Sequence, residues 1–177
     1  SPKNRSAYNF RGDLIKEIQK KGYDVVVTGP NKEGIDKIEA LGAKFIEVPV
    51  NKNGVNPFAD IAYCLKLKNI MKAEKADAIL GYTIKPVIYG SIAAWLAGVK
   101  NRTAMVTGAG YLFASKSLKA RIIRYISFVL YKIGLGAAQK VIFQNIDDLN
   151  EFVEHGLVKK GKCHVVNGSG VNMTKFT

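Results

Sequence analysis

Residues 77–106, DAILGYTIKPVIYGSIAAWLAGVKNRTAMV, decide the fold because two strand-like runs enclose a helix-like run. The runs at residues 78–80 and 103–106 are short and mainly apolar, which is typical of strands buried in a parallel sheet. Pro86 stands where the first turn of a helix tolerates a proline, and apolar residues follow it at helical spacing. A strand, a helix and a second strand with short connections form a right-handed crossover, so we expect the two strands to pair in parallel.

The same alternation continues toward both ends of the chain. Further strands are expected at residues 25–28, 44–48, 141–144 and 164–166, and further helices at 10–21, 32–41, 57–73, 116–134 and 147–155. This pattern predicts an α/β fold, a doubly wound parallel sheet with helices on both faces, in a single domain over residues 1–177. Residues 1–5 cannot form the buried strand with which such a domain starts. We therefore expect the first strand of the sheet to be missing from this sequence.

The charge of the chain is large and unevenly distributed. Its net charge is +13, and with 47% hydrophobic residues it can still bury a core. No acidic residue lies between Asp77 and Asp147, whereas nine basic residues do. A stretch with one sign of charge indicates an anionic partner. No nucleic-acid-binding motif accompanies these charges, so we do not expect that partner to be a nucleic acid.

The remaining composition bounds the compartment and the chemistry. Cys64 and Cys163 have the spacing of neither a disulfide framework nor a zinc site, which fits a reducing cytosol. The sequence shows no signal peptide and no apolar run of the ~18 residues that span a membrane. It also lacks the Gly-x-Gly-x-x-Gly fingerprint of dinucleotide binding. We expect a cytoplasmic protein that uses neither a metal nor a cofactor.

Five segments carry a more specific pattern: residues 9–14 (NFRGDL), 81–86 (GYTIKP), 107–111 (TGAGY), 140–149 (KVIFQNIDDL) and 166–172 (VNGSGVN). In this order they resemble the amino-terminal domain of family-4 glycosyltransferases, which build surface polysaccharides on a lipid carrier. The resemblance implies the Rossmann-like first half of a GT-B fold, in which two such domains face each other across a cleft. It implies that this half binds the acceptor and that a donor-binding domain would follow residue 177. It also implies metal-independent transfer with retention of the anomeric configuration.

Candidate substrate-binding residues lie in the first helix and in the loops after the strands. Ligands of open parallel sheets bind at the carboxyl ends of the strands, where small residues let backbone N–H groups approach phosphate or sugar oxygens. Tyr82 can stack on a sugar, Thr83 can bond a hydroxyl, and Lys85 can neutralise a phosphate. Alternatively, the glycines only form tight turns and Tyr82 simply packs. The candidates are Arg5, Arg11, Gly12, Tyr82, Thr83, Lys85, Thr107, Gly108, Gly110, Tyr111 and Asn145.

The helix expected at residues 116–134 has two different faces. One face carries an apolar stripe that we expect to point toward the core: Leu118, Ile122, Ile126, Val129 and Ile133. The opposite face mixes cations with aromatic residues and has no acids, which is typical of a helix that lies in a membrane interface. The alternative is an ordinary solvated helix whose aromatic residues pack on a neighbour. The candidate membrane-binding residues are Lys116, Lys119, Arg121, Arg124, Phe128 and Lys132.

Together these observations predict glycosyl transfer from a nucleotide-sugar to a polyprenyl-diphosphate-linked acceptor in polysaccharide biosynthesis. The protein would be peripheral on the inner face of the cell membrane, bound to anionic lipid, and these 177 residues alone would be inactive. Neither His155, at a helix end, nor His164, in a strand, suits a general base, so the catalytic residues stay unassigned. Two alternatives remain open. One is half of a GT-B nucleotide-sugar 2-epimerase, which needs acidic and histidine side chains that are missing here, and the other is a non-catalytic subunit that recruits a donor-binding chain to the membrane.

Overall fold

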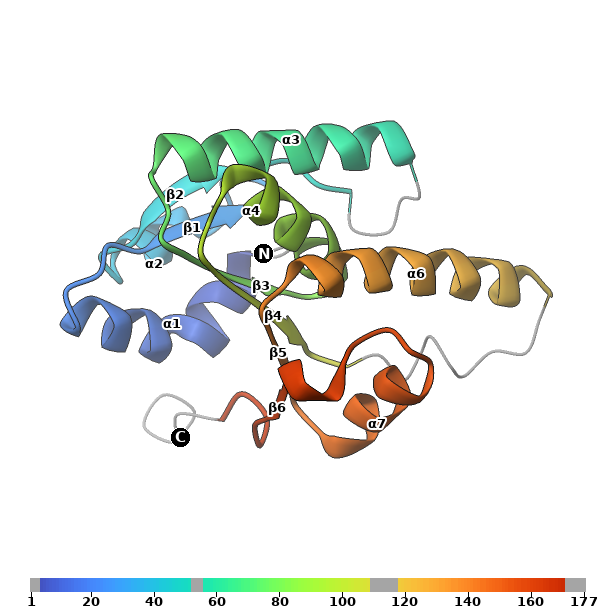
Figure 1. Ribbon diagram of the computed structural model, residues 1–177. Coiled ribbons are helices and arrows are strands. Elements are labelled where there is room, and N and C mark those ends of the chain that lie inside the picture. Colours follow the sequence, from blue (N-terminus) through green and yellow to red (C-terminus); the bar gives the residue numbers. More distant parts are fainter. Residues whose placement is uncertain (1–3, 52–55, 109–117, 171–177) are drawn as a thin grey trace. The chain divides into compact units, whose positions relative to one another are not determined.

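The computed structural model describes residues 4–51, 56–108 and 118–170, in which helices and strands alternate along the chain (Figure 1). The chain divides into two compact units. Unit 1 consists of Ser1–Ala59 and Ser169–Thr177, and unit 2 consists of Asp60–Gly168. Each unit contains its own parallel sheet. Within the described ranges, no helix is both long and apolar enough to span a bilayer.

Unit 1 is a two-stranded parallel sheet accompanied by two helices. Its elements are α1 (Asn4–Lys20), β1 (Val26–Gly29), α2 (Ile35–Glu39) and β2 (Lys44–Glu47). Val26 pairs with Lys44, and the register continues to Gly29 and Glu47. Its core consists of small and aliphatic side chains: Ala7, Ile15, Ile38 and Ala43.

The first helix begins earlier than the sequence pattern indicated. We expected it at residues 10–21, whereas α1 begins at Asn4. The Asn4 side chain explains the difference, because its Nδ2 atom donates to the carbonyl oxygens of Asn31 and Glu33, each at 2.7 Å. These bonds fasten the start of α1 to the loop that follows β1. A long-range contact of this kind leaves no trace in local periodicity.

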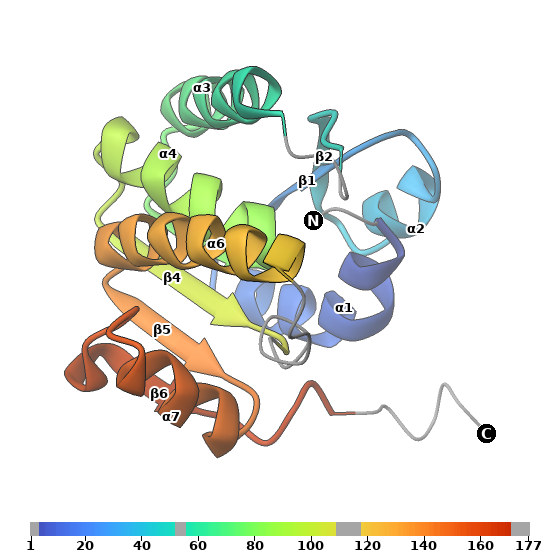
Figure 2. The ribbon, with the colours of Figure 1, turned by 90° about the vertical axis from the view of Figure 1, so that its right-hand side faces the viewer.

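Unit 2 is a four-stranded parallel sheet in the order β3-β4-β5-β6. Its strands are β3 (Ala78–Tyr82), β4 (Asn101–Val106), β5 (Lys140–Phe143) and β6 (Cys163–Val165). The helical elements are α3 (Pro57–Ala73), which belongs to unit 2 from Asp60 onward, the π-helical turn η1 (Pro86–Gly90), α4 (Ser91–Ala97), α6 (Leu118–Ala137), α7 (Ile146–Glu154) and the 3-10 turn η2 (Lys160–Lys162). Helices α4 and α6 lie side by side (Figure 2). The six strands of the two units match those expected from the sequence, and all pair in parallel, so the α/β fold is confirmed.

Three aromatic side chains from α6, β5 and α7 form the centre of the core of unit 2. The ring of Phe152 lies edge-on to those of Tyr131 and Phe143, with centroids 5.1 Å and 5.4 Å away. All three side chains are fully buried. Edge-to-face ring pairs contribute ~0.5–1.5 kcal/mol each beyond the burial of their surface. These contacts therefore fix which face of α6 points inward.

The observed orientation of α6 is opposite to the expected one. Ile122 and Ile133, expected to face the core, are 56% and 54% exposed, and Ile126 and Val129 are exposed as well. The side chain of Leu118, at the start of the stripe, lies outside the described residues. Tyr131, on the other face, is only 2% exposed. Helical spacing identifies a stripe, but when both faces carry apolar residues it does not say which one is buried.

The same reversal corrects one candidate for membrane binding. Phe128 was expected on the outer face of the helix, yet it packs against the core of unit 2. Its ring lies edge-on to that of His155, with the centroids 5.0 Å apart. Phe128 therefore joins α6 to the end of α7 instead of projecting toward a membrane.

A close backbone contact joins α6 to η1. A Cβ atom built at Gly134 would lie 2.6 Å from the Cα atom of Ile88, closer than two non-bonded carbon atoms can approach. Gly134 therefore has no room for a side chain. The backbones of α6 and η1 are in direct contact there. The buried side chains of Val87 and Ile88 belong to the core of unit 2.

We predict that Gly134→Ala destabilises the chain, whereas Gly136→Ala in the same helix does not. The first variant must push α6 away from η1, at an overpacking cost of about 1–3 kcal/mol. The new methyl group at Gly136 would meet no described atom within 4 Å, and alanine raises helix propensity by up to ~1 kcal/mol. Urea unfolding of both variants measures the difference. Equal stability of the two would show that the contact with Ile88 is not tight.

Candidate functional site

A small pocket opens at the carboxyl ends of β3 and β4. Its volume is about 150 Å³. The walls come from the loops after the two strands, from η1 and from α6: Thr83, Ile84, Val87, Val106, Thr107, Gly108 and Tyr131. This is the edge at which open parallel sheets bind their ligands. The structure thus brings together three of the predicted site residues, namely Thr83, Thr107 and Gly108.

The backbone of Thr83 is strained. Its φ angle is +68°, a conformation that costs a β-branched residue about 1–3 kcal/mol. The strain follows from the tight return of the chain after β3, since a Cβ atom at Gly81 would lie 2.6 Å from the carbonyl oxygen of Pro86. The Val87 N–H donates to the carbonyl oxygen of Thr83 at 2.9 Å and closes the turn.

The hydroxyl of Thr83 is buried without a hydrogen bond among the residues that the structure describes. An unpaired buried hydroxyl costs ~1–3 kcal/mol relative to one that is bonded. A buried polar atom without a partner on a strained backbone, in the wall of a pocket, is a feature expected of a ligand contact. An incoming donor or acceptor group would recover that cost.

Gly108 also lines the pocket, in the loop that follows β4. Its φ angle is +123°, which side-chain-bearing residues rarely adopt. Among the residues that the structure describes, a Cβ atom there would meet nothing within 4 Å, so the backbone conformation is what requires glycine. The open space beside the backbone is compatible with the predicted approach of a ligand to this loop.

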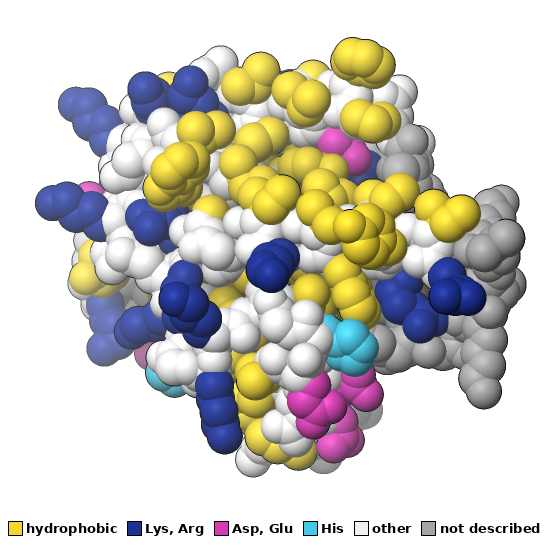
Figure 3. All heavy atoms as spheres, turned by 45° about the vertical axis from the view of Figure 1, so that its right-hand side comes forward, with side chains coloured by type: hydrophobic (Ala, Val, Ile, Leu, Met, Phe, Trp, Pro, Cys, Tyr) yellow, Lys and Arg dark blue, Asp and Glu magenta, His cyan; other side chains and the backbone are white. Residues whose placement is uncertain are grey.

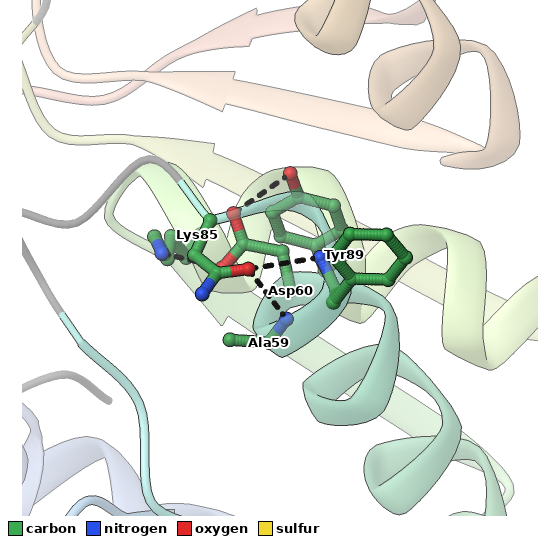
Figure 4. Close-up of polar contacts among 6 residues, drawn as sticks. Ala59, Asp60, Lys85 and Tyr89 are labelled. Carbon is green, nitrogen blue, oxygen red and sulfur yellow. Dashed lines mark hydrogen bonds and ion pairs between the residues drawn. The ribbon is translucent and has the colours of Figure 1, made fainter.

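Lys85, the residue after the pocket-lining Ile84, forms a buried ion pair with Asp60 (Figure 4). The Lys85 Nζ atom donates to Oδ1 of Asp60 at 2.5 Å, and the Tyr89 hydroxyl donates to Oδ2 at 3.1 Å. The side chains of Lys85 and Asp60 are only 13% and 9% exposed. Burial, reinforced by the Asp60 carboxylate, raises the pKa of Tyr89 to about 12. The pair joins the first turns of α3 to the turn that carries Thr83.

Two further buried groups of α3 complete this junction. The Cys64 thiol donates to the carbonyl oxygen of Tyr89 at 3.5 Å, and burial raises the pKa of this thiol. Burial, together with the nearby Cys64 and Asp60, also raises the pKa of Tyr63. Asp60 was not among the predicted site residues. It stands four residues before the apolar Cys64 on α3, and an acid on the buried face of a helix indicates that a cation or hydrogen-bond donor is buried beside it.

The predicted phosphate contact of Lys85 stays a prediction. Lys85 does not line the pocket, and its ammonium is already paired with Asp60. Asn145 is the N-cap of α7, where its Oδ1 atom accepts from the Asp148 N–H at 2.7 Å. Its side chain therefore has a structural role at the carboxyl end of β5. Tyr82, half-buried at the end of β3, also lies outside the lining.

The remaining candidates lie elsewhere. Arg5, Arg11 and Gly12 belong to α1 of unit 1, where Arg5 is exposed and the other two are buried. Gly110, Tyr111 and Lys116 fall outside the described residues, as does the side chain of Lys119. Arg121 and Lys132 are exposed on α6, and Arg124 is half-buried there.

Comparison with known proteins gives the family. Residues 3–145 match the profile of glycosyl transferase 4-like proteins. The N,N'-diacetylbacillosaminyl-diphospho-undecaprenol alpha-1,3-N-acetylgalactosaminyltransferase of Campylobacter jejuni is 30% identical over 171 residues, which is 97% of this chain. The chain belongs to the glycosyl transferase 4-like family. It spans 45% of the length of the Campylobacter relative.

Solved structures share the fold at low sequence identity. A glycosyltransferase from Rickettsia africae aligns over 89% of this chain and 38% of its own, with a TM-score of 0.60 and 16% identity. MurG from Acinetobacter baumannii aligns over 93% and 42%, with a TM-score of 0.55 and 15% identity. A Listeria monocytogenes protein described as a UDP-N-acetylglucosamine 2-epimerase aligns over 92% and 42%, with a TM-score of 0.61 and 14% identity. This family member therefore has the Rossmann-like α/β fold of half a GT-B protein.

We predict that Lys85→Met lowers the free energy of unfolding by about 3–5 kcal/mol, because it leaves the Asp60 carboxylate buried without its cation. The double variant Asp60→Asn/Lys85→Met should recover part of this loss, since no charge then remains buried. Lys20→Met is the control, because the Lys20–Glu17 pair lies exposed on α1, and it should leave stability unchanged. Denaturant unfolding of the three variants tests this, and a double variant no more stable than Lys85→Met would contradict it.

Proposed function

We propose that this chain is the acceptor-binding half of a glycosyltransferase that moves a sugar from a nucleotide-sugar to a saccharide on a polyprenyl diphosphate. The observation that carries the proposal is Thr83, whose backbone is strained and whose buried hydroxyl has no partner within the described part of the chain; it lines the same pocket as Gly108. Saccharides offer the hydroxyl groups that such a side chain can pair with. The family supports the reaction class, and the name of the Campylobacter relative includes a diphospho-undecaprenol acceptor.

In the proposed reaction, an acceptor hydroxyl oxygen bonds to the anomeric carbon of the donor while the bond from that carbon to the phosphate oxygen breaks. The hydroxyl proton is released, the nucleoside diphosphate leaves with the electron pair, and the anomeric configuration is retained. Thr83 would orient the acceptor through a hydrogen bond, and the backbone beside Gly108 would approach one of its oxygens. A second domain would hold the donor, which agrees with a chain that spans 45% of its relative.

The proposal also provides a partner for the basic residues. Arg121 and Lys132 are exposed on α6, within the interval from Asp77 to Asp147 that contains no acid. An anionic leaflet attracts each such residue by about 1 kcal/mol. The protein would therefore be peripheral on the cytoplasmic face of the membrane, where the lipid diphosphate of the acceptor could lie along the basic surface.

A nucleotide-sugar 2-epimerase is a second candidate, because a protein of that description has a similar fold. Epimerisation beside an anomeric carbon requires side chains that remove and return a proton, such as carboxylates or imidazoles. Those residues that line the pocket in the described ranges include neither. A non-catalytic recruiting subunit would need a separate donor-binding chain, and a reading frame that encodes both halves would exclude it.

We predict that Thr83→Val in the full-length enzyme lowers kcat/KM for the lipid-linked acceptor about tenfold, the effect of losing one hydrogen bond of ~1.4 kcal/mol. Valine is β-branched like threonine, so the backbone strain is the same and stability should not fall. Thr83→Ser keeps the hydroxyl and should retain most activity. Transfer of labelled sugar, followed by chromatography of the lipid product, measures these rates. Wild-type turnover by Thr83→Val would refute the role of the hydroxyl.

We predict that these 177 residues alone neither transfer sugar nor hydrolyse a nucleotide-sugar, and bind free nucleoside diphosphate weakly. The reason is that the donor would be held by the other half of the enzyme. Calorimetric titration with UDP checks this. Submicromolar affinity would mean that the donor and acceptor halves are assigned the wrong way round.

A further inference from the structure

Three helices of unit 2 expose large apolar side chains over one surface (Figure 3). We call this surface the apolar face. Its members are Ile61 and Leu65 on α3, Trp95 and Leu96 on α4, and Ile122, Ile123, Tyr125, Ile126, Val129 and Ile133 on α6. Soluble proteins rarely expose a contiguous apolar patch of more than a few hundred square ångströms without using it for binding.

Helix α6 forms the longest part of the apolar face. Its exposed stripe runs from Ile122 to Ile133 at steps of four, three and four residues. Its opposite side supplies Tyr131 and Leu135 to the core. The helix is thus apolar on both faces, and such a helix is normally buried on both. Solvation by water alone does not account for four aliphatic side chains in line on its outer surface.

Helices α3 and α4 extend the apolar face in the same way. Trp95 is 59% exposed on α4, although a tryptophan that only filled the core would be covered. On α3, Ile61 and Leu65 are exposed while Tyr63, Cys64 and Leu67 are buried. These helices therefore also carry more apolar surface than the core requires.

The charges that border the apolar face on α6 are all positive, and neither α4 nor α6 contains an acidic residue. Arg121 and Lys132 are exposed on α6, and Lys66 and Lys72 are exposed on α3. A second copy of the chain docked symmetrically on this face would bring these cations against their own counterparts. An anionic bilayer meets both requirements, because it offers an apolar interior bordered by phosphates.

We propose that the apolar face is the membrane-docking surface of this protein, with its aliphatic and aromatic side chains in the acyl-chain boundary and its flanking cations among the headgroups. It differs from the basic and aromatic side of α6 expected from the sequence, since Phe128 packs inward while Arg121 and Lys132 stay exposed at the border of the apolar face. The proposal rests on the proposed function, which puts the acceptor on a lipid. Interfacial helices of this type lie with their apolar side ~5–10 Å into the boundary.

Trp95, the one tryptophan of these 177 residues, reports directly on the apolar face. The full-length chain is mixed with vesicles of phosphatidylcholine and phosphatidylglycerol, and Trp95→Phe identifies the contribution of this residue. We expect the emission of Trp95 to shift to the blue and to be quenched by lipids brominated on their acyl chains. The quenching should persist at 1 M salt, where the Debye length is only ~3 Å, because burial of apolar surface is not screened.

Two matched sets of variants separate the apolar and electrostatic contributions. Ile122→Ser/Ile126→Ser/Ile133→Ser should reduce the vesicle partition coefficient at least tenfold on neutral and anionic vesicles alike, since each change removes apolar carbons from the boundary. Arg121→Gln/Lys132→Gln should reduce binding about tenfold on anionic vesicles at low salt and have no effect on neutral ones. All five side chains are exposed, so thermal unfolding should be unaffected in both sets.

Three results would overturn the docking proposal. They are an emission of Trp95 that vesicles do not change, wild-type partitioning of the triple serine variant, and a blue shift without vesicles that follows protein concentration. The last, with a dimer in analytical ultracentrifugation, would assign the face to a second copy. Transfer to a short-chain, water-soluble diphosphate acceptor tests the proposed function separately. Activity there without vesicle binding would refute docking alone, whereas vesicle binding without activity would refute the transferase alone.

Discussion

The return of the chain after β3 is the constraint on which unit 2 depends. Gly81 has no room for a side chain because the carbonyl of Pro86 lies against it. The turn forces Thr83 into a left-handed conformation and starts the helical residues that carry Lys85. Lys85 then pairs with Asp60 on α3, and the backbone of Ile88 contacts that of α6 at Gly134. One short segment thus sets the pocket, the buried ion pair and the helix contact together.

The alternation of strands and helices was readable from the sequence because its signals are local. Short apolar runs end at turn residues, and Pro57 and Pro86 mark helix starts, so the bounds of α3 agree with the expected residues 57–73. The start of α1 was wrong because it depends on bonds from Asn4 to residues 27 and 29 positions away. Local spacing carries no information about such contacts.

The orientation of α6 was wrong for a related reason. Its branched aliphatic residues form the more regular stripe, yet the core selects Tyr131 because Phe152 offers an edge-to-face partner. That partner lies 21 positions along the chain, in another helix. In the candidate site, too, local features were predictable from the sequence and long-range contacts were not. Thr83 and Gly108 followed from their place after strands, whereas the pairing of Asp60 with Lys85 depends on how α3 packs.

The orientation of α6 ties the pocket to the apolar face. Tyr131 lines the pocket from the inner side of the helix, and Val129 and Ile133, two residues before and after it, point outward. A lipid-linked saccharide has three parts, namely a polar saccharide, a diphosphate and an apolar chain. A helix that presents a pocket wall on one side and aliphatic side chains on the other, with Arg121 and Lys132 along its length, offers complementary surfaces to all three. Had the branched stripe faced inward, as its spacing suggested, the tyrosine would have left the pocket and α6 would not have contributed its aliphatic stripe to the apolar face. The packing of Tyr131 on Phe152 is therefore as important for the proposed acceptor site as any residue in its lining.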